Sequence, residues 1–189
     1  MDSTQVNYEN SATREYLDVI REHVIRPLES TTVAESCFAA AMLIFGAMDG
    51  LGRLIHPDDH AGAGVRFKAF LPRLGAHYQT CSSELWKLRN SLSHSAMNVA
   101  CFMSKIEDAR GKHLESVRGY LFIHTKRLLE DFKNAFHQLE QEMRTCTVLL
   151  QRAESRLERA DIAPAPWRYE TVYATPPGPI SFVQEKKTT

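Results

Sequence analysis

Hydrophobic residues recur every three or four positions along most of this chain, a spacing that places them on one face of an α-helix. The recurrence predicts helices over residues 11–27, 65–75 and 77–94. Between the first two of them, the segment "VAESCFAAAMLIFGAMDGLGRLI" (33–55) is apolar on nearly every side. A helix without a polar face has to be covered by other elements. We therefore expect it to be the central helix, with Thr31 or Thr32 as its N-terminal cap.

The longest periodic segment runs from Thr125 to Ala160, and its apolar residues alternate by three and four positions. Such a seam is typical of a coiled coil and predicts one continuous last helix over 125–160. At a rise of ~1.5 Å per residue this helix would be about 50 Å long. Because a small domain cannot cover so long a helix, we expect its C-terminal half to pack against a partner, most simply a second copy of the chain. The seam residues are Leu129, Phe132, Phe136, Leu139, Met143, Cys146, Leu150, Ala153 and Leu157.

Two short segments depart from the helical pattern. Residues 98–104 and 119–124 are rich in β-branched and aromatic side chains, which predicts a small β-hairpin or an extended arm. The alternative is that 114–124 extends the following helix. After the last helix, a proline-rich stretch cannot continue it. The expected class is all-α, organised as an N-terminal extension (1–10), one domain of four or five helices (11–160) and an irregular C-terminal tail (161–189).

Composition narrows the function classes. The formal net charge is zero, so no global positive field drives binding to nucleic acid, and any such role has to rest on a local site. The four cysteines are scattered without a C-x-x-C pair, which argues against a zinc site or a disulfide framework and fits a reducing cytoplasm. The polar N-terminus does not resemble a signal peptide, and the longest uncharged run, Ser36 to Met48, is too short to span a bilayer. We therefore expect a cytoplasmic protein that does not enter the membrane.

One stretch, "RNSLSHS" (89–95), concentrates hydrogen-bonding side chains at the end of the predicted helix 77–94. On a helical projection its apolar residues continue a buried stripe, while the polar ones span about 140° on the opposite side. Arginine offers a planar fork that matches phosphate oxygens, and histidine transfers protons near neutral pH. Asparagine and serine orient an imidazole or donate to phosphate. The stripe is Cys81, Leu85, Leu88 and Leu92, and the polar patch is Arg89, Asn90, Ser93 and His94.

The stretch "LWKLRNSLSHS" (85–95) resembles the R-N-x-x-x-H form of the signature of the HEPN superfamily, named for higher eukaryotes and prokaryotes nucleotide-binding. The order of the surrounding segments is similar too: an apolar helix with an internal acid, then "VRFKAFL", the motif helix, a hairpin-like segment and "TKRLLEDFKNAF". The resemblance covers residues 12–145, and only the motif is distinctive. A looser pairing of Arg118 with His124 shows that an arginine shortly before a histidine is by itself a weak signal.

The resemblance implies a helical bundle that forms a homodimer, through the motif helix or through 125–160. In active members two motifs meet at the interface as a metal-independent endoribonuclease, often a toxin or a defence factor. Carried to this chain, Arg89 would bind the scissile phosphate, and His94 would move a proton at the ribose 2′-OH or the leaving 5′-oxygen. Asn90 would orient His94 or contact phosphate, and Ser93 is added by its position on the same face. RNA, an antitoxin or a nucleotidyltransferase would then be the partner.

The alternatives stay open at this point. Other members of the superfamily are non-catalytic nucleotide-binding, protein-interaction or scaffold domains. The motif is also compatible with a plain helix C-terminus, in which Arg89 pairs with an acid and the helix dipole favours a charged His94. Asp49, inside the apolar segment, is expected to be a satisfied buried acid or to bond to the motif helix.

The remaining polar segments favour structural roles. "HPDDH" (56–60) contains metal-ligating residue types, but no further ligand cluster accompanies it, so no metal is expected. "AGAG" (61–64) lacks the spacing of a dinucleotide-binding loop and is interpreted as a linker, so no cofactor is expected. Arginines alternate with glutamates late in the last helix, which predicts a solvated helix face. They are Arg144, Arg152, Arg156 and Arg159.

Overall fold

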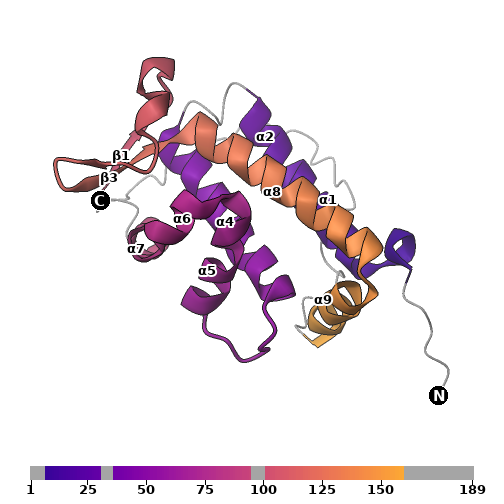
Figure 1. Cartoon of the computed structure of the whole chain (residues 1–189). Coiled ribbons are helices and arrows are strands. Elements are labelled where there is room, and N and C mark those ends of the chain that lie inside the picture. Colours follow the sequence, from indigo (N-terminus) through magenta and orange to yellow (C-terminus); the bar gives the residue numbers. More distant parts are fainter. Residues whose placement is uncertain (1–6, 31–35, 95–100, 160–189) are drawn as a thin grey trace, which may run out of the picture.

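The computed structural model describes residues 7–30, 36–94 and 101–159, and the side chain of His94 lies outside that description. Helices dominate these residues, and a small sheet lies at one end of the molecule (Figure 1). The all-α expectation is confirmed in this coarse form. The longer helices are α1 (Ala12–Ile20), α4 (Cys37–Ile55), α5 (Ala63–Leu74), α7 (Ser82–His94), α8 (Thr125–Thr145) and α9 (Thr147–Arg159).

The predicted central helix is confirmed as α4, which packs against α5, α7, α8 and α9. Its apolar composition follows from this position, since residues such as Ile44 and Leu51 are fully buried. Ser36 caps the helix by accepting a backbone hydrogen bond of 3.2 Å from the first turn. The predicted caps, Thr31 and Thr32, lie outside the described residues. The motif helix α7 thus packs directly against the central helix α4.

The predicted first helix is confirmed as a continuous helical stretch from α1 through a π-helical turn, η2 (Arg21–Ile25), to α2 (Arg26–Glu29). Pro27 stands in the first turn of α2, where hydrogen bonding returns from the π to the α pattern. Proline has no N–H to donate, so one backbone hydrogen bond of the continuous helical stretch is missing at Pro27. Before α1, the short 3₁₀-helix η1 (Tyr8–Asn10) buries Tyr8, so the end of the N-terminal extension belongs to the core.

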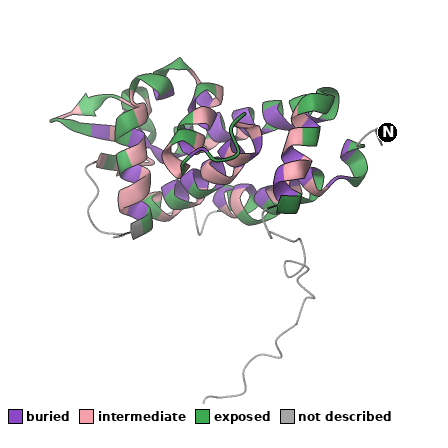
Figure 2. Ribbon diagram, turned by 90° about the horizontal axis from the view of Figure 1, so that it is seen from below, coloured by how far each residue is buried: buried purple, intermediate pink, exposed green. Residues whose placement is uncertain are grey.

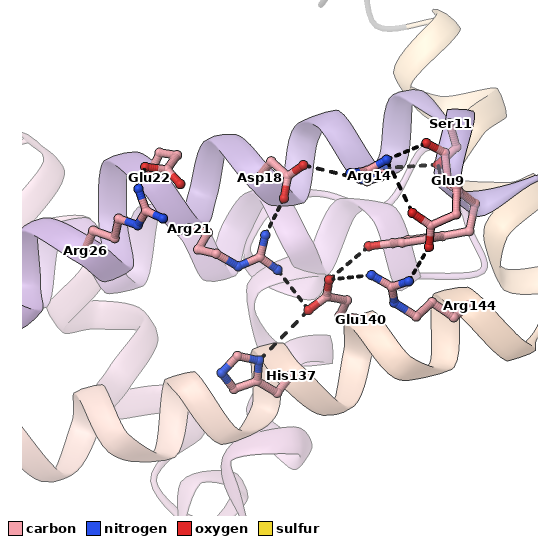
Figure 3. Close-up of polar contacts among 11 residues, drawn as sticks. Glu9, Ser11, Arg14, Asp18, Arg21, Glu22, Arg26, His137, Glu140 and Arg144 are labelled. Atoms are coloured by element: carbon pink, nitrogen blue, oxygen red, sulfur yellow. Dashed lines mark hydrogen bonds and ion pairs between the residues drawn. The ribbon is translucent and has the colours of Figure 1, made fainter.

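A polar cluster around Glu140 fastens this N-terminal segment to α8 (Figure 3). Glu140 accepts hydrogen bonds from Arg21 at 2.9 Å, from Arg144 at 3.2 Å and from the Tyr8 hydroxyl at 3.3 Å. Burial by itself raises the pKa of Glu140, but the hydrogen bonds from the two arginines outweigh it and hold the pKa below its usual range. The buried carboxylate is thereby paired, as a charge away from water has to be.

The predicted helix 65–75 is confirmed as α5, with Phe67, Phe70 and Leu71 fully buried. The predicted helix 77–94 is interrupted. A short helix, α6 (Ala76–Thr80), ends at Cys81, whose φ of −104° and ψ of 24° lie outside the α-helical region, and α7 then begins. The motif therefore belongs to a helix of 13 residues that starts after a turn.

The segment between α7 and α8 forms a three-stranded sheet in the order β1-β3-β2. The strands β1 (Cys101–Ser104) and β3 (Tyr120–His124) run parallel, so the predicted hairpin between these two segments is wrong. A parallel pair needs a crossover, and here the 3₁₀-helix η3 (Glu107–Lys112) and β2 (Ser116–Val117) lie in that connection. The alternative helical extension of 114–124 is wrong as well, because 120–124 is a strand.

A tight turn joins β2 to β3, which pair in antiparallel fashion. Its two central residues, Arg118 and Gly119, have φ angles of 53° and 82°. Positive φ at both positions is the geometry that suits the twist of a two-residue hairpin. Arg118 is exposed there, while His124 is fully buried and caps α8. Arg118 and His124 therefore have separate structural roles, one in the turn and one as a helix cap, and they do not form a second copy of the motif.

The continuous last helix predicted over 125–160 is wrong. The chain leaves the helical conformation at Cys146, with φ −107° and ψ 96°, and α9 then packs back against α1, α4 and α8 (Figure 1). Leu150 and Ala153 are at most 3% exposed against the same chain. The second half of the seam is thus covered without a partner. The three-and-four spacing persists across Cys146 because both helices turn their apolar sides to one core, the inward side that is purple in Figure 2.

Candidate functional site

The motif helix α7 is anchored by its predicted apolar stripe. Leu85, Leu88 and Leu92 are at most 5% exposed, and the helix packs against α4 and α5. Trp86 lies against the α5 backbone at Gly64, where an added Cβ would meet the indole ring at 2.9 Å. Gly64 belongs to the first turn of α5 and is a close-approach residue, which corrects the interpretation of "AGAG" as a linker.

The structure corrects the predicted position of Arg89. Its side chain is only 18% exposed and lies between α7 and α4, not on the outward face. The guanidinium Nη2 donates to Asp49 Oδ2 at 2.6 Å, and Nη1 donates to Asn90 Oδ1 at 3.2 Å. Its central carbon lies 5.3 Å from the centroid of the Trp86 ring, within cation–π range. The expectation that Asp49 bonds to the motif helix is confirmed.

The ion pair leaves one polar atom on each partner unused. Arg89 Nε and Asp49 Oδ1 are buried and have no hydrogen-bond partner among the described residues. Leaving a buried polar group unpaired costs roughly 1–3 kcal/mol, more when it is charged. Such atoms are unusual in native structures and call for an explanation such as a ligand or a functional role. Arg89 is thus held in place by Asp49 and Asn90, and one buried N–H of its guanidinium has no partner among the described residues.

The other predicted site residues occupy different environments. Asn90 is partly exposed and its side-chain oxygen contacts Arg89, so the structure assigns it a partner other than the expected His94. Ser93 is exposed. His94 is the last residue of α7, and the direction of its side chain lies outside the described residues. The structure therefore brings Arg89, Asn90 and Asp49 together.

Asp49 also lines a pocket of about 160 Å³ that sequence reasoning did not find. Three arginines share its wall: Arg53 from α4, Arg66 from α5 and Arg156 from α9. Arg53 follows Asp49 by four residues, so its place on the same helical face was readable from the sequence. The other two come from helices that meet α4 only in the folded chain, so no local signal reveals them.

A second buried polar cluster joins Tyr78, His113 and Asp131. The Tyr78 hydroxyl donates to Asp131 Oδ2 at 2.9 Å and lies 2.7 Å from His113 Nε2. His113 Nδ1 accepts from the backbone N–H of His124 at 3.0 Å, so the ring proton is assigned to Nε2, which donates to the Tyr78 oxygen. Burial lowers the pKa of His113 to about 4. A neutral imidazole in this arrangement fastens the sheet region to α6 and α8.

The acidic loop 56–60 is used for internal ion pairing. Asp59 accepts from Arg156 Nε at 2.7 Å and from Arg159 at 2.6 Å, and the Arg156 hydrogen bond is the main cause that lowers its pKa. His56 Nδ1 accepts from the backbone N–H of Asp58 at 3.1 Å. Across 7–30, 36–94 and 101–159, no three His, Cys, Asp or Glu residues are grouped so as to hold a metal ion.

The solvated face predicted for the late arginines is confirmed for Arg144 and Arg159, which are exposed, but it is wrong for Arg156, and Arg152 is half-buried. Arg156 is only 5% exposed, and it also donates to the backbone carbonyl of Arg53. Arg152 donates to the carbonyl of Ile55 at 3.2 Å. Arg144 binds Glu140 and stacks over Tyr8. These side chains fasten α8 and α9 to the rest of the chain because α9 folds back over α4.

In comparisons with known proteins, no family model, curated protein or solved structure matches this chain. Among the described residues, one helix, Cys37–Ile55, is long and apolar enough to cross a membrane by length and composition. It is the central helix α4, surrounded by four other helices and carrying Asp49 in an ion pair, so packing accounts for its composition.

Proposed function

We propose that this chain is a HEPN-like protein that cleaves RNA as a homodimer, without a metal ion. The observation that carries the proposal is the fixed guanidinium of Arg89, which is held by Asp49 and Trp86 and retains an unpaired Nε. A preorganised cation is what stabilises the charge that develops on a phosphate in the transition state. It stands five residues before His94, as in the R-N-x-x-x-H motif.

In the proposed reaction, Arg89 binds the non-bridging oxygens of the scissile phosphate. His94 accepts the proton of the ribose 2′-OH, whose oxygen attacks phosphorus as the bond to the 5′-oxygen breaks. The His94 of a second copy donates a proton to the leaving 5′-oxygen. The products are a 2′,3′-cyclic phosphate and a 5′-hydroxyl end, and DNA is not cleaved because it lacks the nucleophile. Asn90 keeps Arg89 in place through its 3.2 Å contact, and Ser93 is an added donor on the exposed side.

The second candidate is a non-catalytic HEPN-like domain that binds a nucleotide or a protein. The same ion pair favours this candidate. Asp49 lies 2.6 Å from the Arg89 guanidinium and already neutralises its charge, so less of that charge is available to a phosphate. The zero net charge also provides no general attraction for RNA. In either case we place the protein in the cytoplasm, with RNA, a nucleotide, an antitoxin or a nucleotidyltransferase as the partner class.

The test is cleavage of single-stranded RNA by the purified protein in EDTA. We expect cyclic-phosphate products, and a loss of rate of roughly 100-fold or more in Arg89→Ala and in His94→Ala. Lys87→Ala is the matched control, because Lys87 is an exposed cation on the same helix, and it should keep its rate within about twofold. Absence of cleavage by the wild-type protein rejects the enzymatic proposal.

The homodimer has its own measurement. Light scattering should give twice the chain mass, and mixing Arg89→Ala with His94→Ala should restore part of the activity if two copies complete one site. A monomeric mass at concentrations that support cleavage contradicts the composite site. Nucleotide binding that persists in an Arg89→Ala/His94→Ala double variant, with no cleavage by wild type, favours the non-catalytic domain.

A further inference from the structure

Four helices converge on the pocket that Asp49 lines. Tyr16 comes from α1, Arg53 from α4, Arg66 from α5 and Arg156 from α9, and Asp49 is the acid among the lining residues. These residues are up to 140 positions apart in sequence, so the tertiary fold alone creates the arrangement. The pocket stands beside the motif but does not contain it, since Arg89 is not part of its wall.

The charge around the pocket is strongly positive. Asp49 is occupied by Arg89, and Asp59 is shared between Arg156 and Arg159. The guanidinium groups of Arg53 and Arg66 make no ion pair or side-chain hydrogen bond with the part of the chain that the structure describes. Two cations thus line a small cavity without an ion-pair partner among the residues that the structure describes.

Two of the lining arginines also have a buried N–H group without a hydrogen-bond partner among the described residues. Arg66 Nε is buried and has no hydrogen-bond partner among the described residues. Arg156 is 5% exposed, and its Nη2 makes no hydrogen bond although it lies 2.7 Å from Asp59 Oδ1. Buried guanidinium N–H groups are normally satisfied, because leaving them unpaired is costly.

Tyr16 supplies a neutral donor to this cavity. Its hydroxyl lies against α4 at Gly50, where an added Cβ would be 2.1 Å from the hydroxyl oxygen, so Gly50 makes room for the ring. Burial raises the pKa of Tyr16, which therefore keeps its proton at neutral pH. The hydroxyl has no hydrogen-bond partner among the described residues.

The size of the pocket selects the ligand. A volume of about 160 Å³ is smaller than the roughly 300–1,000 Å³ of pockets that enclose a whole small molecule. It suits one tetrahedral oxyanion whose substituent, if any, leaves through the mouth. Arginine forks match such oxygens in geometry and charge. We propose that this cavity is a binding site for a phosphate monoester or free phosphate, held by Arg53, Arg66 and Arg156 with Tyr16 as a further donor.

The experiment is thermal unfolding of the full chain with inorganic phosphate, against sodium chloride of equal ionic strength. At a phosphate concentration near 100 times the dissociation constant, we expect the Tm to rise by on the order of 5 °C. The Arg53→Gln/Arg66→Gln double variant should lose this gain and keep only the general effect of phosphate as an excluded salt. Lys68→Gln, an exposed cation on α5, is the matched control and should respond like wild type. Equal gains in wild type and the double variant overturn the proposal.

The same unfolding measurement with other ligands distinguishes a phosphate monoester from free phosphate. Stabilisation by uridine 5′-monophosphate but not by uridine supports a nucleotide monoester, while stabilisation by inorganic phosphate alone supports the free ion. An oligoribonucleotide without terminal phosphates that protects as well as the monoester overturns the proposal in favour of a diester site. The inference is independent of RNA cleavage, because His94→Ala should abolish cleavage and leave the phosphate-dependent rise in Tm intact, since His94 is not part of the pocket wall.

Discussion

Arg89 on the motif helix and Asp49 on the central helix, 40 positions apart in sequence, form an ion pair of 2.6 Å in which each side chain is 18% exposed. The pair fixes the arginine of the motif to the core. It also places the motif next to the phosphate pocket, because Asp49 lines that pocket. A single carboxylate therefore connects the two candidate sites of this protein.

The first prediction concerns the strength of this pair. Asp49→Asn should lower the free energy of unfolding by roughly 1–3 kcal/mol, because it leaves a largely buried guanidinium without its counter-charge. Urea unfolding of Asp49→Asn, Arg89→Gln and the double variant measures the coupling directly. Effects that add to within about 0.5 kcal/mol would show that the contact has no net energetic role. Glu84→Gln, on the exposed first turn of α7, is the control.

The second prediction concerns pH. His113 has a pKa of about 4 in the folded chain against 6.5 when unfolded. The unfolded chain therefore binds a proton first, so stability should fall as pH drops from about 6.5 to about 4, by up to roughly 3 kcal/mol. Protonation at Nδ1 would also set a second N–H against that of His124, which now donates to it at 3.0 Å. Unfolding measured between pH 7 and pH 4 should show a flatter profile in His113→Gln, and identical profiles would contradict the assignment.

The third prediction uses two glycines of α4. A Cβ on Gly52 would lie 2.0 Å from the backbone carbonyl oxygen of Arg66, so Gly52→Ala should force α4 and α5 apart and destabilise the chain by about 2 kcal/mol or more. Gly46 is exposed and has nothing within 4 Å of the added atom. Gly46→Ala should therefore stabilise the helix by roughly 0.5–1 kcal/mol. Chemical denaturation of both variants tests the close helix contact, and destabilisation of equal size in both would refute it.

The fourth prediction concerns Glu140. Glu140→Gln should destabilise the chain by roughly 1–3 kcal/mol, because Arg21 and Arg144 then lose a shared, largely buried counter-charge. The lowered pKa of Glu140 means that its contribution is present above the unfolded pKa of about 4.5 and is lost as pH falls below it. Glu142→Gln is the control, since Glu142 is 47% exposed in its pair with Arg73 and should matter little. Equal effects of the two changes on the urea midpoint would contradict the stabilising role of the polar cluster around Glu140.

Sequence reasoning succeeded where information is local. The buried sides of α5 and α7 follow from the spacing of their apolar residues, and Asp49 was expected to have a partner because a charge in an apolar segment needs one. Sequence reasoning failed where two different structures have the same local pattern of residues. The break at Cys146 keeps the three-and-four spacing, and a parallel pair of strands has the same composition as a hairpin.

The sequence by itself determined that the chain is mostly helical, which apolar residues of α5 and α7 are buried and which helix end carries the polar motif, since these depend on periodicity within one element. The tertiary structure decided that Arg89 turns inward to Asp49, that α9 covers its own core, and that Arg53, Arg66 and Arg156 share one pocket. The physical reason is that the partners of a charge or an apolar face are chosen by chain segments far away in sequence. Their approach depends on the packing of whole helices, which no local pattern records.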